Sequence, residues 1–399
     1  MALTQVKTAG LTDGSVTAAK LAAGILTSGG TDWQATIQTS NFTAVAGKGY
    51  FVDTTSGIIT ISLPAGVVGT EIAIQDYAGT FDTNKIVISA NGSEKIQGQT
   101  ADKFCETENA LVRLVYQNAA QGWTGNDMTS GPPLTVEYLV VAGGGSGGSN
   151  SNSGGGGAGG YRTNYGGTAL SLLAATNYNV TVGAGAAATT SSPWNGTAGS
   201  NSDFNNISAT GGGGGAGQGG SSSSGGSGGG GAYDTVGANG NAGNYTPVEG
   251  YAGGAGVASG NYPGGGGGGA SEAGNTDGSG YGGDGASNSI TGSAVVYAGG
   301  GSGGVSSGYS IIPGGDGGGG AGGRGTVAVG ASGTANTGGG AGGGAGSYVG
   351  GAGGSGVVIL RYANTKTLTI PGGLTSTTAT VGSDKVTTFT AGTGNIQFN

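Results

Sequence analysis

The chain has 399 residues, of which 102 are Gly and 8 are Pro, and its 12 Lys and Arg against 20 Asp and Glu give a net charge of −8. Because the chain has no His and one Cys, it lacks a Ser-His-Asp site, the commonest metal ligand and an intrachain disulfide. The acidic balance disfavours nucleic acid as a partner, and no apolar run reaches the roughly 20 residues that span a bilayer, which argues against membrane insertion. We expect no metal and no other cofactor.

Residues 1–32 contain one candidate for a short helix. Thr12, Asp13 and Ser15 are possible N-caps for a body that runs from Ala18 to Ala22. A helix of this length is not stable alone in water, so the segment is either a flexible leader or an attachment segment that docks elsewhere. The N-terminus also lacks the apolar stretch of a signal peptide. If the protein acts outside a cell, we expect release by lysis.

Residues 33–130 are typical of a small β domain. Alternating apolar residues and β-branched side chains predict strands at residues 49–52, 58–63, 71–74, 86–88 and 111–116. Turn signals such as Pro64-Ala65-Gly66 and Asn91-Gly92 separate them. Cys105 falls in this domain, where we expect it to be a small buried hydrophobe.

Residues 134–362 form a glycine-rich domain, in which 81 of the 221 residues from 141 to 361 are Gly. Strand-like segments at 136–141 and 357–362 bracket the Gly-rich runs, and we expect these two segments to pair. Residues 363–399 follow as a short C-terminal β unit, with strands predicted at 367–370, 385–390 and 395–398.

The Gly-rich runs carry neither an alternating apolar face nor a helical one, so an ordinary sheet or an α-helix cannot use them. An extended helix of three residues per turn suits them, because its N–H and C=O groups point outward and adjacent glycine backbones can approach closely. Ordering Gly costs more conformational entropy than ordering any other residue, so such a bundle requires nearly every amide to be paired. Disorder is the alternative. The predicted fold is all-β or irregular, with a small N-terminal β domain, a polyglycine-II helix bundle and a short C-terminal β unit.

The sequences that bracket and enter the glycine-rich domain resemble those of a known family. Tyr138-Leu-Val-Val-Ala-Gly-Gly-Gly145 begins the domain, Ala158-Gly-Gly-Tyr-Arg162 follows, and Gly354-Ser-Gly-Val-Val-Ile-Leu-Arg-Tyr362 ends it. Together they resemble the glycine-rich domain of bacteriophage tail-fibre proteins, notably those of marine phages, and more distantly the tip adhesins of T-even phages. The resemblance implies a virion protein that binds a host cell-surface receptor and other tail or fibre proteins. A homotrimer is the usual symmetry of fibre shafts, whereas the T-even tip is a monomer.

The connectors between the glycine runs hold the candidate binding residues. If consecutive runs go up and down, their connectors alternate between two ends, and 161–210 and 232–252 are the long ones. Tyr combines an apolar ring with a polar tip and few torsions to freeze, which suits a recognition surface. Each ring could equally pack against the bundle. The candidate receptor-binding residues are Tyr161, Tyr165, Trp194, Tyr233, Asp234, Tyr245, Tyr251, Tyr262 and Tyr309.

The function that the sequence favours is receptor binding by a phage tail-fibre adhesin, without catalysis. One alternative is a structural or ice-binding polyglycine protein, which predicts a flat, repetitive face rather than irregular Tyr-bearing loops. Another is a fibre-borne glycan-degrading enzyme, for which no pair of carboxylates stands out in the sequence. The GxGxxG matches do not indicate a dinucleotide-binding site, because they arise by chance in a region this rich in Gly and none follows a strand of a βαβ unit.

Overall fold

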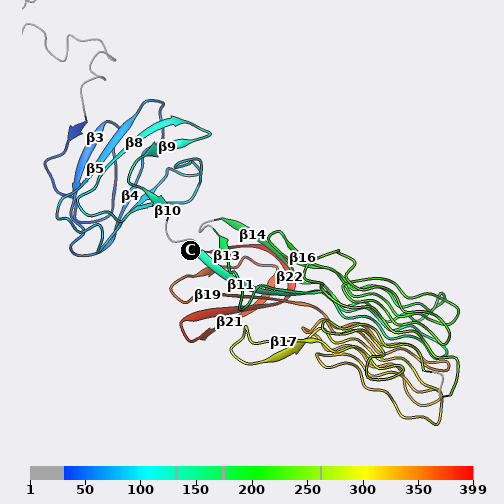
Figure 1. Cartoon of the computed structure of the whole chain (residues 1–399). Coiled ribbons are helices and arrows are strands. Elements are labelled where there is room, and N and C mark those ends of the chain that lie inside the picture. The colour runs from blue at the N-terminus through cyan, green and yellow to red at the C-terminus, as the bar shows by residue number, and fades with distance from the viewer. Residues whose placement is uncertain (1–30, 131–133, 173–175, 261–262, 399) are drawn as a thin grey trace, which may run out of the picture. The chain divides into compact units, whose positions relative to one another are not determined.

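A computed structural model describes residues 31–130, 134–172, 176–260 and 263–398 (Figure 1). Across these ranges the protein is all-β, as predicted, and contains no helix. No helix suited to crossing a membrane is present in the described ranges. The helix expected between Ala18 and Ala22 lies outside them. The chain divides into two compact units, Met1–Pro132 and Pro133–Asn399, which are described in turn.

The first unit consists of two five-stranded sheets that enclose one apolar core. One sheet has the order β1 (Asp32–Trp33), β3 (Lys48–Val52), β5 (Glu71–Asp76), β8 (Leu111–Asn118) and β9 (Gly122–Gly125). The other has the order β10 (Thr129–Ser130), β7 (Lys103–Cys105), β6 (Ile86–Ser89), β4 (Ile59–Ser62) and β2 (Phe42–Thr43).

The alternating sequence pattern of this unit matches its observed burial. In β4 and β6 every second residue is fully buried, and Trp123 and Phe81 fill the centre of the core with an exposure of 0%. The predicted strands therefore correspond to β3, β4, β5, β6 and β8. Cys105 is a buried free thiol, as expected, and burial raises its pKa.

The second unit is built on a ten-stranded sheet in which β11 (Leu134–Val141) pairs antiparallel with β19 (Val357–Ala363), from Val136↔Tyr362 to Val141↔Val357. The expected pairing of the two bracketing segments is thus confirmed. The sheet curls until it nearly closes: its two edge strands come together, and the Arg162 guanidinium of β12 donates to the Ser208 carbonyl of β16 at 3.0 Å. The other short strands are β12 (Tyr161–Thr163), β13 (Leu170–Leu172), β14 (Asn177–Thr181), β15 (Ser202–Phe204) and β16 (Ile207–Ala209), and a separate hairpin pairs β17 (Ala286–Asn288) with β18 (Val295–Tyr297).

The C-terminal strands join this sheet. The segments 385–390 and 395–398, predicted as two strands, are one continuous strand, β22 (Asp384–Phe398). The prediction divided it at Ala391–Gly394, where the small residues look like a turn. β22 pairs with β14, β19, β20 (Leu368–Thr369) and β21 (Leu374–Val381), and the sequence analysis did not predict β21.

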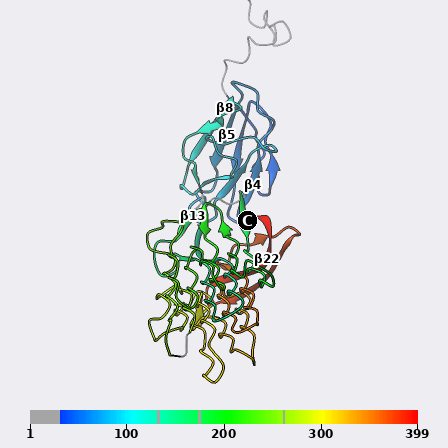
Figure 2. The same ribbon diagram turned by 90° about the vertical axis from the view of Figure 1, so that its right-hand side faces the viewer.

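The Gly-rich runs leave this sheet as extended segments that lie side by side (Figures 1 and 2). Segment 142–149 shows how they are held, since its amides and that of Asn150 donate to backbone carbonyls over 2.8–3.1 Å with a step of three residues. The amides of residues 142, 145 and 148 donate to one neighbour, at carbonyls 160, 157 and 154. The amides of 143, 146 and 149 donate to a second neighbour, at carbonyls 200, 197 and 194. The amides of 144, 147 and 150 donate to a third, at carbonyls 354, 351 and 348.

The carbonyls of the same segment accept from three other neighbours. Gly143 and Ser146 accept from Gly212 and Gly215, Gly145 and Gly148 accept from Ala341 and Gly344, and Gly144 accepts from Ala186. Segment 142–149 therefore has six neighbours, and its amides are paired throughout. At the glycine positions, the spacing between these backbones leaves no room for a side chain: a Cβ built at Gly156 would lie 2.2 Å from the Gly145 carbonyl oxygen.

Segments at the border of this arrangement have partners on one side only. In segment 236–241 the amides of Ala238 and Asn241 donate inward, to Gly229 and Gly226. Within the described chain, the intervening amides at 236, 237, 239 and 240 make no backbone hydrogen bond. Gly237 and Gly240 face the adjacent segment 250–253, whereas Val236 and Asn239 are exposed. The three-residue step thus places Gly on the inside and side chains on the outside.

Candidate functional site

The extended segments have two ends, which we call the base and the tip. The base is the end at which the segments join the strands, and the tip is the opposite end, where the chain reverses in short turns (Figures 1 and 2). Segment 142–149, for example, continues from β11 to the tip turn Ser149–Ser153, and segment 154–160 returns to β12. The connectors therefore alternate between two chemically different ends.

The tip turn Ser149–Ser153 contacts four other tip turns. Ser149 N donates to the Trp194 carbonyl at 2.8 Å, and Asn150 N donates to the Tyr348 carbonyl at 3.1 Å. Tyr233 N donates to the Asn152 carbonyl at 3.1 Å, and Asn152 Nδ2 donates to Ser306 Oγ at 2.8 Å. Asn150 and Ser151 adopt positive φ angles of 65° and 61°, which the tight reversal requires. The turns therefore form one connected surface.

Four of the predicted residues lie at this surface: Trp194, Tyr233, Asp234 and Tyr309. Tyr233 and Tyr309 are 40% and 45% exposed, Asp234 is exposed, and Trp194 is half-buried. Tyr262 lies outside the described residues. Backbone hydrogen bonds, rather than a local apolar core, hold these turns in place, so the side chains are presented from a fixed main chain.

Three other predicted residues, Tyr161, Tyr165 and Tyr245, lie at the base. The Tyr161 hydroxyl accepts from Asn288 Nδ2 at 2.8 Å, and burial raises the pKa of this phenol. The Arg361 guanidinium carbon is 5.7 Å from the Tyr165 ring centroid, and that of Arg162 is 3.9 Å from the Tyr245 ring centroid. These rings pack against the sheet and its cations. They do not share a surface with the tip residues.

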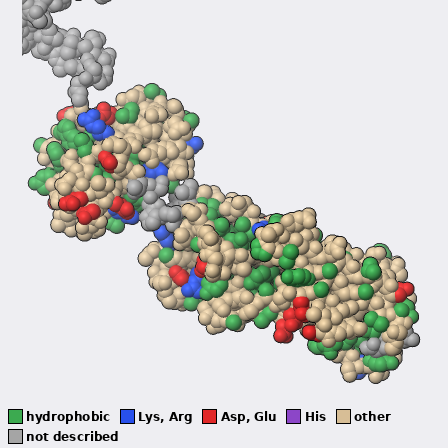
Figure 3. Space-filling model, in the orientation of Figure 1, with side chains coloured by type: hydrophobic (Ala, Val, Ile, Leu, Met, Phe, Trp, Pro, Cys, Tyr) green, Lys and Arg blue, Asp and Glu red, His purple; other side chains and the backbone are tan. Residues whose placement is uncertain are grey.

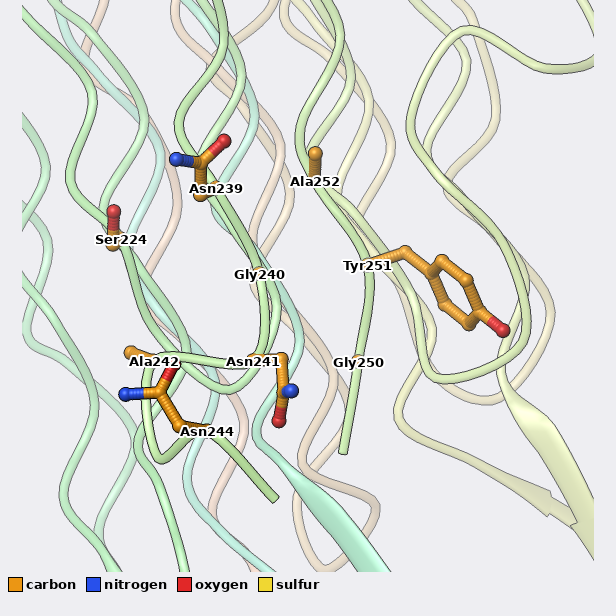
Figure 4. Close-up of a pocket in the computed structure, with 9 residues that line it drawn as sticks. All are labelled: Ser224, Asn239, Gly240, Asn241, Ala242, Asn244, Gly250, Tyr251 and Ala252. Carbon is orange, nitrogen blue, oxygen red and sulfur yellow. The ribbon is translucent and has the colours of Figure 1, made fainter. Parts of the chain in front are cut away.

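Tyr251 lies on the flank, beside a shallow depression of about 640 Å³ (Figure 4). The backbone of Tyr251 lines the depression, but its ring points away from the Asn241 and Asn244 side chains. A second depression of about 400 Å³ shares Ser224 and Asn239 with the first. Neither contains a charged side chain, so the polar side chains of this flank are amides and hydroxyls.

Three carboxylates, those of Glu272, Asp277 and Asp284, come within 4.8 Å of one another, a spacing that could hold a cation. Two of them already accept backbone amides: Glu272 Oε1 accepts from Asp284 N at 3.2 Å, and Asp284 Oδ1 accepts from Asp316 N at 2.7 Å. These contacts fix the positions of segments 271–275, 281–285 and 314–316.

The sequence analysis missed two tip residues, Tyr348 and Arg324. Tyr348 follows the same pattern as the predicted rings, in a connector between two glycine runs, and its carbonyl accepts from Asn150. Arg324 is the only cationic residue between Arg162 and Arg361 in the sequence, and a single cation in so long a stretch is the sequence signal that identifies it as a candidate.

The connector analysis also missed extended segments that contain little Gly. The long connectors 161–210 and 232–252 include the extended segments 182–188, 195–200 and 236–241, each hydrogen-bonded to glycine segments. Because the chain changes direction at each segment, overlooking one segment exchanges base and tip for every connector that follows it. Gly at every third position, as at Gly196 and Gly199 or Gly237 and Gly240, is the sequence signal that identifies two of them.

Comparison with known proteins assigns the glycine-rich part of the chain to a family. The sequence model of a family described as a glycine-rich domain matches residues 124–363, more than half of the chain. No curated protein matches the sequence.

Proposed function

The chain belongs to a family of glycine-rich domains, and from this premise we propose that it is a bacteriophage tail-fibre adhesin. In this proposal the tip turns bind a host cell-surface receptor, without catalysis, and the glycine segments are a rigid polyglycine-II scaffold. Residues 1–32 attach the protein to other tail or fibre proteins of the virion.

The three-residue step of the backbone hydrogen bonds supports the scaffold part of the proposal. Polyglycine II, like polyproline II, has three residues per turn and a rise of about 3.1 Å, so amides three residues apart face the same neighbour. Segment 142–149 follows this rule toward three neighbours at once. A net hydrogen bond contributes only about 0.5–1.5 kcal/mol, so the arrangement depends on many of them forming together.

The observation that carries the binding part is the gathering of irregular, aromatic turns at one end. Four aromatic residues come from turns that are far apart in sequence: Trp194, Tyr233, Tyr309 and Tyr348. The turns of Trp194, Tyr233 and Tyr348 are hydrogen-bonded to the turn Ser149–Ser153, and the turn of Tyr309 contacts it through Ser306. Aromatic side chains with few torsions lose little entropy on binding and dominate recognition surfaces. An ice-binding protein would instead need a flat, regular array, and the tip is not repetitive.

An adhesion experiment tests this proposal. The full chain, fluorescently labelled, is mixed with a panel of marine bacterial isolates, and binding is measured by flow cytometry. For any isolate that binds, the quadruple variant Trp194→Ala, Tyr233→Ala, Tyr309→Ala and Tyr348→Ala is expected to bind at least tenfold more weakly. Tyr77→Ala, which removes a 55% exposed ring from the first unit, serves as the control. Equal binding by the quadruple variant and the control would rule out the tip as the contact surface.

A further inference from the structure

Two neighbouring tip turns, Val305–Ile312 and Gly323–Val329, are joined through their backbones. Val305 N donates to the Gly323 carbonyl at 2.9 Å, and Gly325 N donates to the Val305 carbonyl at 3.0 Å. A Cβ built at Gly325 would lie 3.2 Å from Ser307 N, so the turns are in close contact. We call these two turns the Arg324 ridge.

The ridge exposes large apolar side chains. Tyr309, Ile311, Val327 and Val329 are between 42% and 59% exposed, whereas Val305 and Ile312 are buried beneath them. In Figure 3 the rest of this end is largely uncharged, with hydrophobic side chains among polar ones. Apolar side chains that gather on the surface of a soluble protein commonly mark an interaction site.

Arg324 is a cation without a partner in the middle of this ridge. Among the described residues, its side chain makes no hydrogen bond and no ion pair, and its Nε is buried without an acceptor. A guanidinium without a protein partner binds a carboxylate through two parallel hydrogen bonds, and charge-assisted bonds of this kind are the strong ones. The ridge therefore presents an unpaired cation between exposed apolar side chains.

We propose that the Arg324 ridge docks a protein partner that presents an Asp or Glu carboxylate within an apolar surface. The proposal rests on the proposed function, because it names the receptor class that the tip binds. Arg and Tyr are enriched in protein–protein hot spots, and the buried core of an interface is more apolar than the rest of the surface. A neutral glycan would be bound mainly by amides and hydroxyls, which line the flank depressions, whereas the ridge adds a cation and four exposed apolar side chains to its Ser and Thr hydroxyls. A heavily phosphorylated glycan would call for several cations, and the ridge has one.

Selection from a displayed library of random peptides tests the partner chemistry. The library is selected on the full chain alone, and the enriched peptides are then tested for binding to Arg324→Ala. We expect the enriched peptides to contain Asp or Glu next to apolar residues, and to bind Arg324→Ala at least tenfold more weakly. Arg324→Lys is expected to recover only part of this loss, because Lys cannot form the two parallel bonds. Enriched peptides without an acidic residue, or peptides that bind Arg324→Ala equally well, would overturn the proposal.

Two controls separate docking from folding and from other anions. Lys366→Ala and Val248→Ser remove a charge and an exposed apolar side chain at the base, and both are expected to leave peptide binding unchanged. The Arg324 Nε–H signal in NMR spectra should shift with an acidic peptide at lower concentration than with inorganic phosphate or galacturonate. Tighter binding of either small anion would overturn the protein partner. If cell adhesion falls in the quadruple tip variant but not in Arg324→Ala, this inference fails while the proposed function stands.

Discussion

The first unit and the glycine-rich segments of the second unit exclude water from their interiors in opposite ways. In the first unit, side chains such as Ile72, Ile74 and Trp123 form the interior, and the backbone is paired along strands. In the glycine-rich segments the interior is the backbone itself, since each chain meets its neighbours where a side chain would otherwise stand. The first unit gains stability from apolar area removed from water, and the glycine-rich segments gain it from the number of paired amides.

The difference determines which substitutions each unit tolerates. A side-chain core can lose a methyl group and relax around the gap, at a graded cost. A glycine such as Gly156 in the backbone core cannot gain a methyl group, because the atom in the way is the Gly145 carbonyl oxygen, which is itself hydrogen-bonded. The base combines both kinds of interior, and its buried tyrosines join the strands to the glycine segments.

The largest effect is expected from adding a side chain inside the glycine segments. Gly156→Val would place Cβ 2.2 Å from the Gly145 carbonyl oxygen. We expect the unfolding free energy of the second unit to fall by more than about 4 kcal/mol, which is exceptional for one substitution. Denaturant unfolding followed by Tyr fluorescence measures it. Gly372→Val, at a position with nothing within 4 Å, is the matched control and should change little. Similar stability of the two variants would show that the segments are not closely packed.

Removing a core side chain from the first unit should have a graded effect. Ile72 is completely buried in β5, so Ile72→Ala is expected to cost about 2–5 kcal/mol and Ile72→Val about 0.5–1.5 kcal/mol. Val68→Ala, at a 73% exposed position, is the control. The transition of the second unit should be unaffected by any of the three. A shift of both transitions together would contradict the independence of the two kinds of core.

A smaller loss is expected where one hydroxyl joins the strands to the segments. Ser202 is completely buried, and its Oγ donates to the Val141 carbonyl and accepts from Gly183 N, both at 2.8 Å. Ser202→Ala leaves Gly183 N without this acceptor and the Val141 carbonyl without this donor, and it is expected to cost about 1–3 kcal/mol. The exposed Ser383→Ala is the control, and thermal unfolding of the two variants compares them. Equal melting temperatures would mean that this hydroxyl does not hold the junction.

The smallest effect is the response of the base to alkaline pH. Burial raises the pKa values of Tyr138, Tyr161, Tyr297 and Tyr362. Their contribution to stability is complete below the unfolded-state pKa of about 10 and is lost as pH rises through the higher folded-state values. The unfolding free energy of the second unit should therefore fall above about pH 10, and Tyr297→Phe should make this fall with pH less steep. A slope that is the same in Tyr297→Phe as in the parent chain would refute this origin.

The sequence predicts the first unit well because its signal is local. Alternation in segments such as 59–62 and 86–89 reports directly which side chains are buried. The pairing of β11 with β19 was also predictable, because these two apolar segments bracket the Gly-rich runs. The prediction divided β22 at Ala391–Gly394, because small residues within a long strand have the same composition as a turn.

The arrangement of the tip could not be predicted in this way. Glycine runs carry no side chains that would specify their neighbours, so the sequence does not show that 142–149 lies beside 194–200 and 348–354. Extended segments with few Gly, such as 236–241, have the composition of loops. Each segment that is missed shifts the predicted position of all following connectors from the base to the tip, or from the tip to the base. Tyr161 and Trp194 look alike as aromatic residues between glycine runs, yet one lies at the base and the other at the tip.

Residue-resolved amide hydrogen exchange in the native full chain tests the backbone core most directly. In segment 142–149 every amide has a carbonyl partner, whereas in segment 236–241 only Ala238 and Asn241 do. We predict slow exchange at all positions from Ala142 to Ser149, comparable to that of β5, and an alternation in 236–241 with slow exchange at Ala238 and Asn241 only. Fast exchange throughout 142–149, at the rate of an unfolded peptide, would contradict the account.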